Sequence, residues 1–135
     1  MHKEKQLVDD IIKKYNTSNP FEICQLKGYK LAFSPIGFLN GMYRYSKKNV
    51  FITINRDRDR YTQIAACGHE LGHSIMHPNQ NTVFMGSSTF FITEKQEIEA
   101  DRFSAYLQLE YYKDISSISD RYLKLVDRDI LKNYT

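Results

Sequence analysis

The residues of this sequence whose types and spacing suit chemistry are His69, Glu70 and His73, in the pattern His-Glu-x-x-His. Two histidines at this spacing lie on one face of a helix, so both imidazoles can bind one zinc ion at about 2.0–2.1 Å. Glu70 points beside that position, where a carboxylate can take a proton from a metal-activated water. The pattern predicts a hydrolytic zinc site; the alternative is a chance match in an ordinary buried helix.

A zinc ion held by two histidines needs a third protein ligand, with water in the open fourth position. The next predicted helix offers two glutamates. On a helical wheel Glu97 shares a polar face with Asp101, whereas Glu99 falls between Phe103 and Tyr106 on the apolar side. A carboxylate on an apolar face is costly unless it is paired or binds a metal. We therefore expect Glu99 to be the third ligand and keep Glu97 as the alternative.

His77 continues the spacing of the motif, but distance excludes it as a ligand of the same ion. Eight residues of helix rise about 12 Å, so His69 and His77 cannot share one metal. We expect His77 to line the mouth of the site, cap the end of the helix or pack there, while Glu99, if it is not a ligand, could lie at the surface or pair with Arg102 or His77. The reaction also needs a group that stabilises the oxyanion. Tyr43, Tyr45, His77 and the arginines are all candidates for that role.

The motif is predicted to lie in a long helix that begins at Asp57 or Asp59 and is ended by Pro78. Gly68 and Gly72 are four residues apart and form a smooth strip on this helix. A glycine inside a helix costs about 1 kcal/mol relative to alanine. The strip therefore indicates that a neighbouring element approaches closely there.

The helix with the third ligand is predicted to begin at a capping box of Thr93 and Gln96 and to run to about Glu110. A poorly patterned connection, residues 79–92, precedes it and is long enough to cross over the site. Beyond this helix, Ser119 is expected to cap one last amphipathic helix.

Two amphipathic helices and then three strands are predicted before the motif. The fold class is therefore α+β, with a small three-stranded antiparallel or mixed sheet packed against a helical core that carries the motif. We expect a single metallopeptidase domain over residues 1–135. Its parts are the N-terminal helices (1–28), the small sheet (29–55), the zinc-site helices (57–110) and a C-terminal helical segment (111–135).

Composition narrows the class of protein. Hydrophobic residues make up 41% and charged residues 26% of the 135, which is typical of a soluble globular domain. A net charge of +3 with no long basic run argues against nucleic-acid binding. No stretch is apolar enough for a membrane span or a signal peptide, which favours a cytoplasmic protein. Cys24 and Cys67 form no Cys-x-x-Cys pair and are expected to be reduced, buried thiols.

Taken together, the motifs resemble those of the ImmA/IrrE family of metallopeptidases. Three stretches carry the resemblance: the strand Val50-Phe51-Ile52-Thr53-Ile54-Asn55, the His69-Glu70-Leu71-Gly72-His73 helix closed by His77, and Glu97-Ile98-Glu99-Ala100-Asp101-Arg102-Phe103. The last is similar to the Glu-Ala-x-x-Phe signature of the family. Asn19-Pro20-Phe21-Glu22-Ile23 and Leu39-Asn40-Gly41 also fit. The resemblance covers roughly residues 18 to 110.

The resemblance implies a zincin-like, gluzincin-type zinc endopeptidase of the cytoplasm, of a kind often carried by phages or mobile elements. Residue by residue, it places zinc on His69, His73 and Glu99, with Glu70 as the catalytic acid and base. The partner that it implies is a protein substrate, a helix-turn-helix transcriptional repressor, with no direct contact to nucleic acid or membrane. The same ligands accept Mn²⁺ or another divalent metal. The oligomeric state stays open.

A different function is also compatible with the motifs. A zinc-containing regulatory protein could control a repressor by docking to it without proteolysis. Glu70 weighs against this alternative, because a structural zinc site has no use for that carboxylate and is usually closed by four protein ligands.

Overall fold

The computed structural model describes residues 2–78 and 93–135. The elements follow the order α1 (Lys3–Tyr15), α2 (Pro20–Leu26), β1 (Lys30–Ser34), β2 (Gly41–Ser46), β3 (Asn49–Asn55), α3 (Arg60–Met76), α4 (Glu94–Tyr112), η1 (Ile115–Ser117), α5 (Asp120–Leu123), α6 (Arg128–Leu131) and η2 (Lys132–Tyr134). The expected crossing of residues 79–92 over the site lies outside the described residues. Among the helices that are described, none has the length and apolarity of a membrane span.

The three strands form one mixed sheet in the order β1–β3–β2. β1 pairs with β3 in parallel, and β2 pairs with β3 antiparallel. Lys47 and Lys48 join β2 to β3 with φ values of 50° and 66°. Positive φ at both positions is what a two-residue hairpin of type I′ requires. The predicted α+β class, with a small sheet beside a helical core, is confirmed, and β2 is an edge strand.

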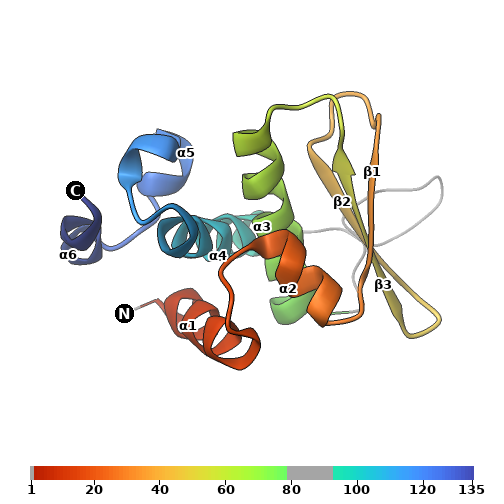
Figure 1. The fold of residues 1–135 in the computed structure, drawn as a ribbon, viewed down its shortest axis with the longest axis horizontal. Helices are drawn as coiled ribbons and strands as arrows, with labels where there is room; N and C mark the ends of the chain where they lie inside the picture. Colours follow the sequence, from red (N-terminus) through yellow and green to blue (C-terminus); the bar gives the residue numbers. More distant parts are fainter. Residues whose placement is uncertain (1, 79–92) are drawn as a thin grey trace.

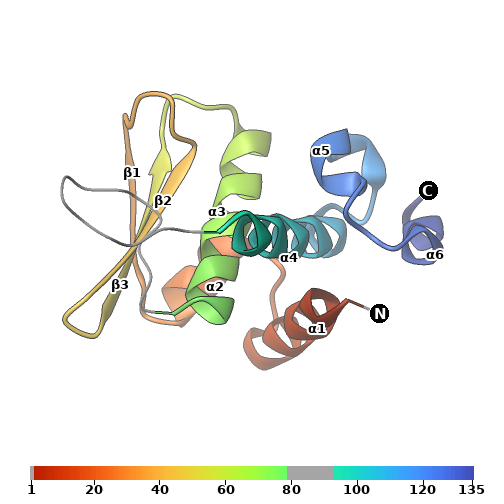
Figure 2. The ribbon, with the colours of Figure 1, turned by 180° about the vertical axis from the view of Figure 1, so that it is seen from behind.

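Helix α3 lies at the centre of the molecule, between the sheet and α4 (Figures 1 and 2). It begins at Asp59, whose side chain accepts a hydrogen bond of 2.8 Å from the Thr62 backbone N–H. Every residue from Ile64 to Ser74 is buried. The middle of the motif helix is therefore buried, and its neighbours decide what its histidines meet.

Helix α4 packs on the glycine strip of α3. A Cβ added to Gly68 would lie 2.7 Å from Ser104 Oγ, and one added to Gly72 would lie 3.0 Å from Phe103 Cβ. Ser104 Oγ also donates a 2.7 Å hydrogen bond to the Ala65 carbonyl of α3. The close approach predicted from the two glycines is confirmed, and α4 is the element that makes it.

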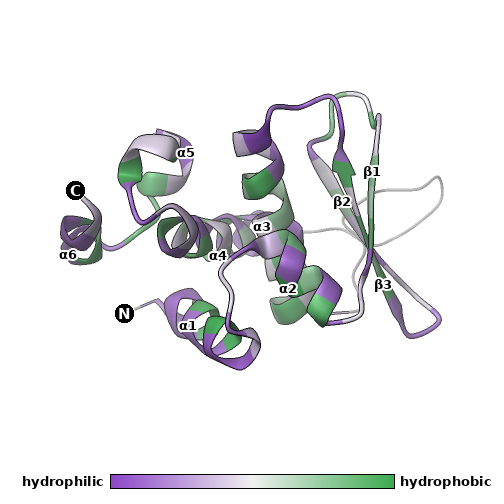
Figure 3. Cartoon of the chain, viewed as in Figure 1, coloured by the Kyte–Doolittle hydropathy of each residue, from purple (hydrophilic) through white to green (hydrophobic). Residues whose placement is uncertain are grey.

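The remaining core lies where α1 and α2 meet this pair of helices and the sheet. Figure 3 shows hydrophobic residues where α2, α3 and the strands come together. Asn19 caps α2 by accepting from the backbone N–H groups of Phe21 and Glu22. Cys24 and Cys67 are fully buried thiols, with their Sγ atoms 3.8 Å apart between α2 and α3. Their expected burial is confirmed.

The C-terminal segment differs from the single helix expected after Ser119, because it forms two short helices, α5 and α6. Side chains of α4 bind the backbone at the break between them. Arg102 Nε donates to the Leu125 carbonyl at 3.1 Å, and the Tyr106 hydroxyl accepts from the Asp127 N–H at 3.2 Å. These contacts occupy backbone groups that a continuous helix would use internally.

The segment before β2 is held by side chains from the end of β3. Asn55 Nδ2 donates to the carbonyls of Gly37 and Leu39, at 2.9 and 2.8 Å. Arg58 Nε donates to Asn40 Oδ1 at 2.8 Å. Asn55, which is buried, and Arg58 therefore fix the position of residues 39–41.

Candidate metal centre

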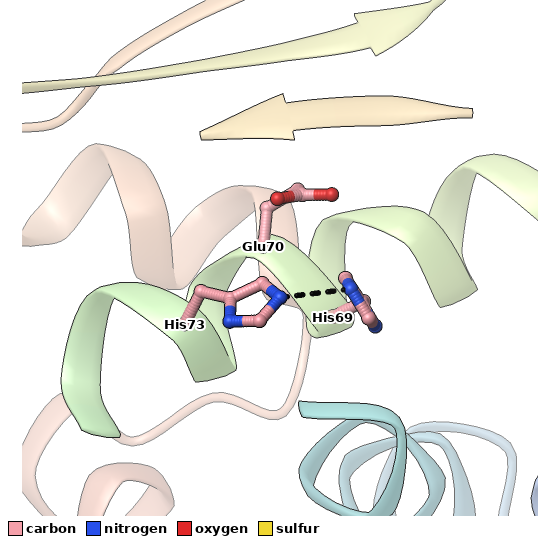
Figure 4. A group of neighbouring side chains, drawn as sticks. All are labelled: His69, Glu70 and His73. Carbon is pink, nitrogen blue, oxygen red and sulfur yellow. Dashed lines mark hydrogen bonds between the residues drawn. The ribbon is translucent and has the colours of Figure 1, made fainter. Parts of the chain in front are cut away.

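Helix α3 brings His69, Glu70 and His73 together as the motif predicts. One ligand atom from each lies within 4.8 Å of the others. The two imidazoles face each other with their Nε2 atoms 3.0 Å apart, while Glu70 points toward the strands (Figure 4). Two lone pairs cannot face each other at that distance without a proton or a cation between them.

The carboxylate that completes this group belongs to Glu97 of α4. Its Oε1 lies 2.7 Å from His73 Nε2 and 3.5 Å from His69 Nε2. Four donors placed tetrahedrally at about 2.0–2.1 Å from zinc are about 3.3 Å from one another. The observed separations of 2.7, 3.0 and 3.5 Å are close to that value. These three side chains therefore fit a zinc ion with one open position.

Glu99, the ligand expected from the helical wheel, is placed elsewhere. Its Oε1 lies 3.0 Å from His77 Nε2, and its Oε2 accepts from the Lys3 ammonium of α1. The structure thus brings Glu97, the alternative, to the histidine pair and gives Glu99 two other partners. Glu99, the expected third ligand, is therefore not beside the Nε2 atoms of His69 and His73 in this structure.

The reason lies in the faces of α4. Glu97 and Glu99 are two residues apart, so they point about 200° away from each other and cannot face the same helix. The polar face that begins at the half-exposed Glu97 packs on α3 further along the helix, where Ser104 and Gln108 are buried. The buried Glu99 does have the compensating partners that its position demands, but they are a lysine and a histidine instead of a metal.

Each ligand histidine has a second hydrogen-bond partner behind it. His69 Nδ1 lies 2.7 Å from Asp101 Oδ1, and Arg121 Nη2 donates to Asp101 Oδ2 at 3.1 Å. His73 Nδ1 lies 3.0 Å from Nδ1 of His77, the residue that ends α3. Such partners fix the tautomer and ring orientation of metal-binding histidines, leaving both Nε2 atoms for the ligand side.

The charges of the group favour a cation. Burial lowers the pKa of His69, but hydrogen bonds to Asp101 and Glu97 outweigh burial and raise it to about 10. The hydrogen bonds from His69 and His73 likewise overcome burial and hold the pKa of Glu97 well below its usual range. Burial lowers the pKa of His73. The carboxylates are therefore ionised at neutral pH, and a positive charge between them is stabilised.

Glu70 lies against the first residue of the edge strand. A Cβ added to Gly41 would be 3.1 Å from Glu70 Cγ and 3.2 Å from its Oε2. The Glu70 side chain is 4% exposed, with the metal position on one side and the backbone of β2 on the other. A glycine at position 41 is what leaves room for this carboxylate.

A cleft of about 180 Å³ opens at this centre. It is lined by residues 39–41, by Arg121 and Tyr122 of α5, and by Glu70 and Glu97. A second hollow of about 200 Å³ shares Asn40, Arg121 and Tyr122 with it and runs along the N-terminal half of α3. Because they share these residues, the two hollows form one groove beside the donor atoms.

Three of these site residues were not identified from the sequence. A signal existed for Asp101, because it lies four residues after Glu97 and so shares its helix face. No local pattern pointed to Arg121 or Tyr122, which reach the cleft only because the C-terminal segment folds back as a separate short helix.

Comparisons with known proteins identify the family of the chain. The chain matches the family model of the IrrE N-terminal-like domain, a peptidase family, over residues 24–123. It is 38% identical over 106 residues to "Uncharacterized immunity region protein 2" of Bacillus phage phi105, covering 78% of this chain and 67% of that one. It is 28% identical over 105 residues to "Metallopeptidase ImmA" of Bacillus subtilis (strain 168), covering 78% of this chain and 62% of that one.

The chain thus spans roughly two thirds of the length of these two relatives. No solved structure matches it. The matched residues contain the whole donor set, from His69 to Asp101, and extend through Tyr122. The chain therefore belongs to the IrrE N-terminal-like family, the ImmA/IrrE metallopeptidases that its motifs resemble.

Proposed function

We propose that this protein is a zinc-dependent endopeptidase of the cytoplasm, with zinc held by His69, His73 and Glu97. The observation that carries the proposal is the near-tetrahedral spacing of three donor atoms, two imidazole nitrogens and one carboxylate oxygen. A second carboxylate, Glu70, lies beside them without ligating and lines the open cleft. Donor atoms of this kind also accept Mn²⁺ or other divalent ions, so the choice of zinc as the native metal is itself proposed.

When bound, the metal would polarise the scissile carbonyl and lower the pKa of water. Glu70 is the group that takes the proton of the attacking water and passes it to the leaving nitrogen. Its position supports this role, because it lies beside the two Nε2 atoms without facing them (Figure 4). The contact with Gly41 keeps the carboxylate at the cleft, where a peptide would lie.

The oxyanion needs a hydrogen-bond donor, and we assign this role to the Tyr122 hydroxyl. Among the earlier candidates, Tyr43 is fully buried in the core and His77 is engaged with His73 and Glu99. Tyr122 lines the cleft together with Glu70 and Glu97. Burial raises its pKa to about 12, so the phenol keeps its proton at neutral pH. The neighbouring Arg121 is already bound to Asp101.

We further propose that the substrate is a helix-turn-helix repressor of a phage or mobile element, cleaved to release its control. Two observations support this step. The family resemblance implies such a substrate, and one relative is named for a phage immunity region. A groove lined by backbone and polar side chains suits an extended segment of a protein better than a small apolar ligand.

The test is to incubate the zinc-loaded protein with the repressor encoded beside its gene. We expect cleavage by the wild type that a chelator abolishes, no cleavage by Glu70→Gln, and wild-type cleavage by Glu22→Gln, a matched change on the exposed surface of α2. Chelator-insensitive cleavage, or an active Glu70→Gln protein, would overturn the mechanism. Release of repression in cells by Glu70→Gln without cleavage would instead establish docking as the function.

A further inference from the structure

A chain of hydrogen-bonding groups runs from the metal face of α3 to the first turn of α1. His73 Nδ1 lies 3.0 Å from His77 Nδ1, and His77 Nε2 lies 3.0 Å from Glu99 Oε1. The other oxygen of Glu99 accepts from Lys3. The chain therefore connects a residue at the N-terminal end of the described structure with the second ligand histidine.

The chemistry of the groups gives this chain one direction. If His73 turns Nε2 to the metal, its proton is on Nδ1, which must donate to His77. His77 then accepts at Nδ1 and carries its own proton on Nε2, which donates to the Glu99 carboxylate. Each contact has one donor and one acceptor only with His77 neutral in this tautomer.

We propose that His77 is a positioning residue for the metal centre, and that Glu99 and Lys3 hold His77 in the tautomer it needs. The inference rests on the proposed metal site of His69, His73 and Glu97. It assigns a purpose to the third histidine of the sequence pattern, and it explains why a carboxylate is buried at Glu99 although that residue faces away from the metal.

Burial is what makes the chain consequential. His73 is fully buried, and His77 and Glu99 are 8% and 7% exposed, so water is largely excluded from the first two contacts. A buried N–H group without an acceptor is costly, and an imidazole without one can rotate or change tautomer. The Lys3 side chain is 62% exposed, so its share is smaller.

The arrangement mirrors the one behind His69, where Asp101 and then Arg121 follow. Both ligand histidines thus end at a carboxylate paired with a cation. The difference is that an additional imidazole lies between His73 and its carboxylate. This extra link makes the second ligand dependent on the end of α3 and on α1.

The experiment measures zinc affinity of the metal-free protein by competition with a chromophoric chelator. His77→Phe keeps the ring volume but has no acceptor, and we expect it to bind zinc about 10–100-fold more weakly. His77→Asn retains an acceptor near the position of Nδ1 and should recover part of that loss. His2→Phe is the matched control, because His2 is not one of the hydrogen-bonded groups that connect His73 to Lys3. The His2→Phe protein should bind zinc as the wild type does.

Coupling between variants separates positioning from a general loss of structure. Glu99→Gln should weaken zinc binding less in the His77→Asn background than in the wild type, because the part of its effect that passes through His77 is already lost there. Additive losses would overturn the inference even if His77→Phe failed to fold. Circular dichroism of each metal-free variant monitors the fold.

Tautomers give a readout that is independent of affinity. Long-range ¹H–¹⁵N spectra of the zinc-loaded protein should show His77 protonated at Nε2 and not at Nδ1. Protonation at Nδ1, or wild-type zinc affinity of His77→Phe, would overturn the inference. If the wild type itself bound no zinc, the proposed metal site would fall instead, so the two failures are distinguishable.

Discussion

Replacing Glu97 with glutamine tests the assignment of the third ligand most directly. As a ligand, its carboxylate would lie about 2.1 Å from the metal, and its side chain is 48% exposed, so screening is close to that of water. At that distance a dication and a carboxylate attract each other by about 4 kcal/mol in a medium of water-like dielectric constant. A glutamine oxygen still ligates weakly, so we expect zinc affinity to fall by roughly 10²- to 10³-fold.

Glu99→Gln is the matched variant, because it makes the same chemical change two residues along the same helix. Two imidazoles and two hydrogen bonds separate Glu99 from the metal position, a distance of roughly 10 Å. Its direct attraction to the metal is therefore about five times smaller, and the expected loss is about 10-fold, shared between this attraction and the effect of Glu99 on His77. Competition titrations of both metal-free proteins give the comparison. A larger loss for Glu99→Gln than for Glu97→Gln would return the ligand role to Glu99 and refute the geometry.

Three further changes test other parts of the molecule. Tyr122→Phe should lower kcat for peptide cleavage by about 10²-fold with little change in KM, because only the hydroxyl that meets the oxyanion is lost. Gly68→Ala should destabilise the metal-free protein by about 1–3 kcal/mol in urea unfolding, since the new methyl meets Ser104 Oγ at 2.7 Å. Glu110, whose pKa is lowered by a hydrogen bond from Tyr134 despite opposing burial, should stabilise the fold above about pH 4.3 and lose that effect as the pH falls.

Each of these expectations has a clear contrary result. A Tyr15→Phe protein is the control for the phenol, and an equal loss of kcat in both variants would remove the special role of Tyr122. Alanine normally favours a helix over glycine by about 1 kcal/mol, so a stabilised Gly68→Ala protein would mean that α4 is not pressed on the strip. For Glu110, the free energy of unfolding of Glu110→Gln would be measured as a function of pH. If it fell with acid as steeply as that of the wild type, Glu110 would not contribute the expected pH-dependent stability.

Local patterns were sufficient for the parts of the fold that depend on neighbouring residues in the chain. The spacing of His69 and His73 placed both on one helix face. The sequence offered Asp57 or Asp59 as the start of α3, of which Asp59 is the cap, and the capping box at Thr93 marked the start of α4. The glycine strip predicted a close neighbour for the same reason, because the cost of each glycine is local. These features needed no knowledge of which element packs where.

The carboxylate that lies beside the two histidines could not be chosen in this way. The wheel separates Glu97 from Glu99 correctly, but it does not say which face of α4 meets α3 and which meets α1. A polar face on a helical wheel favours solvent exposure, whereas Ser104 and Gln108 lie buried against α3. The burial of Glu99 was anticipated, and its partners, Lys3 and His77, come from elements whose placement is a tertiary property.

The break between α5 and α6 has the same origin. Apolar residues continue at helical spacing after Ser119, and this favours one helix. The contacts of Arg102 and Tyr106 with the backbone at the break come from α4, far away in the sequence. Tyr122 reaches the cleft for that reason, and its role could be inferred only from the folded chain.

The division of the donor atoms between α3 and α4 has a thermodynamic consequence. A metal that binds only when the two helices are packed adds its binding free energy to the stability of the fold, about 2.7 kcal/mol at a free concentration one hundred times Kd. A typical domain is stable by only about 5–15 kcal/mol, so this contribution is a sizeable share. Metal supply would then govern how long the protein survives proteolytic turnover in the cell, as well as whether it is active.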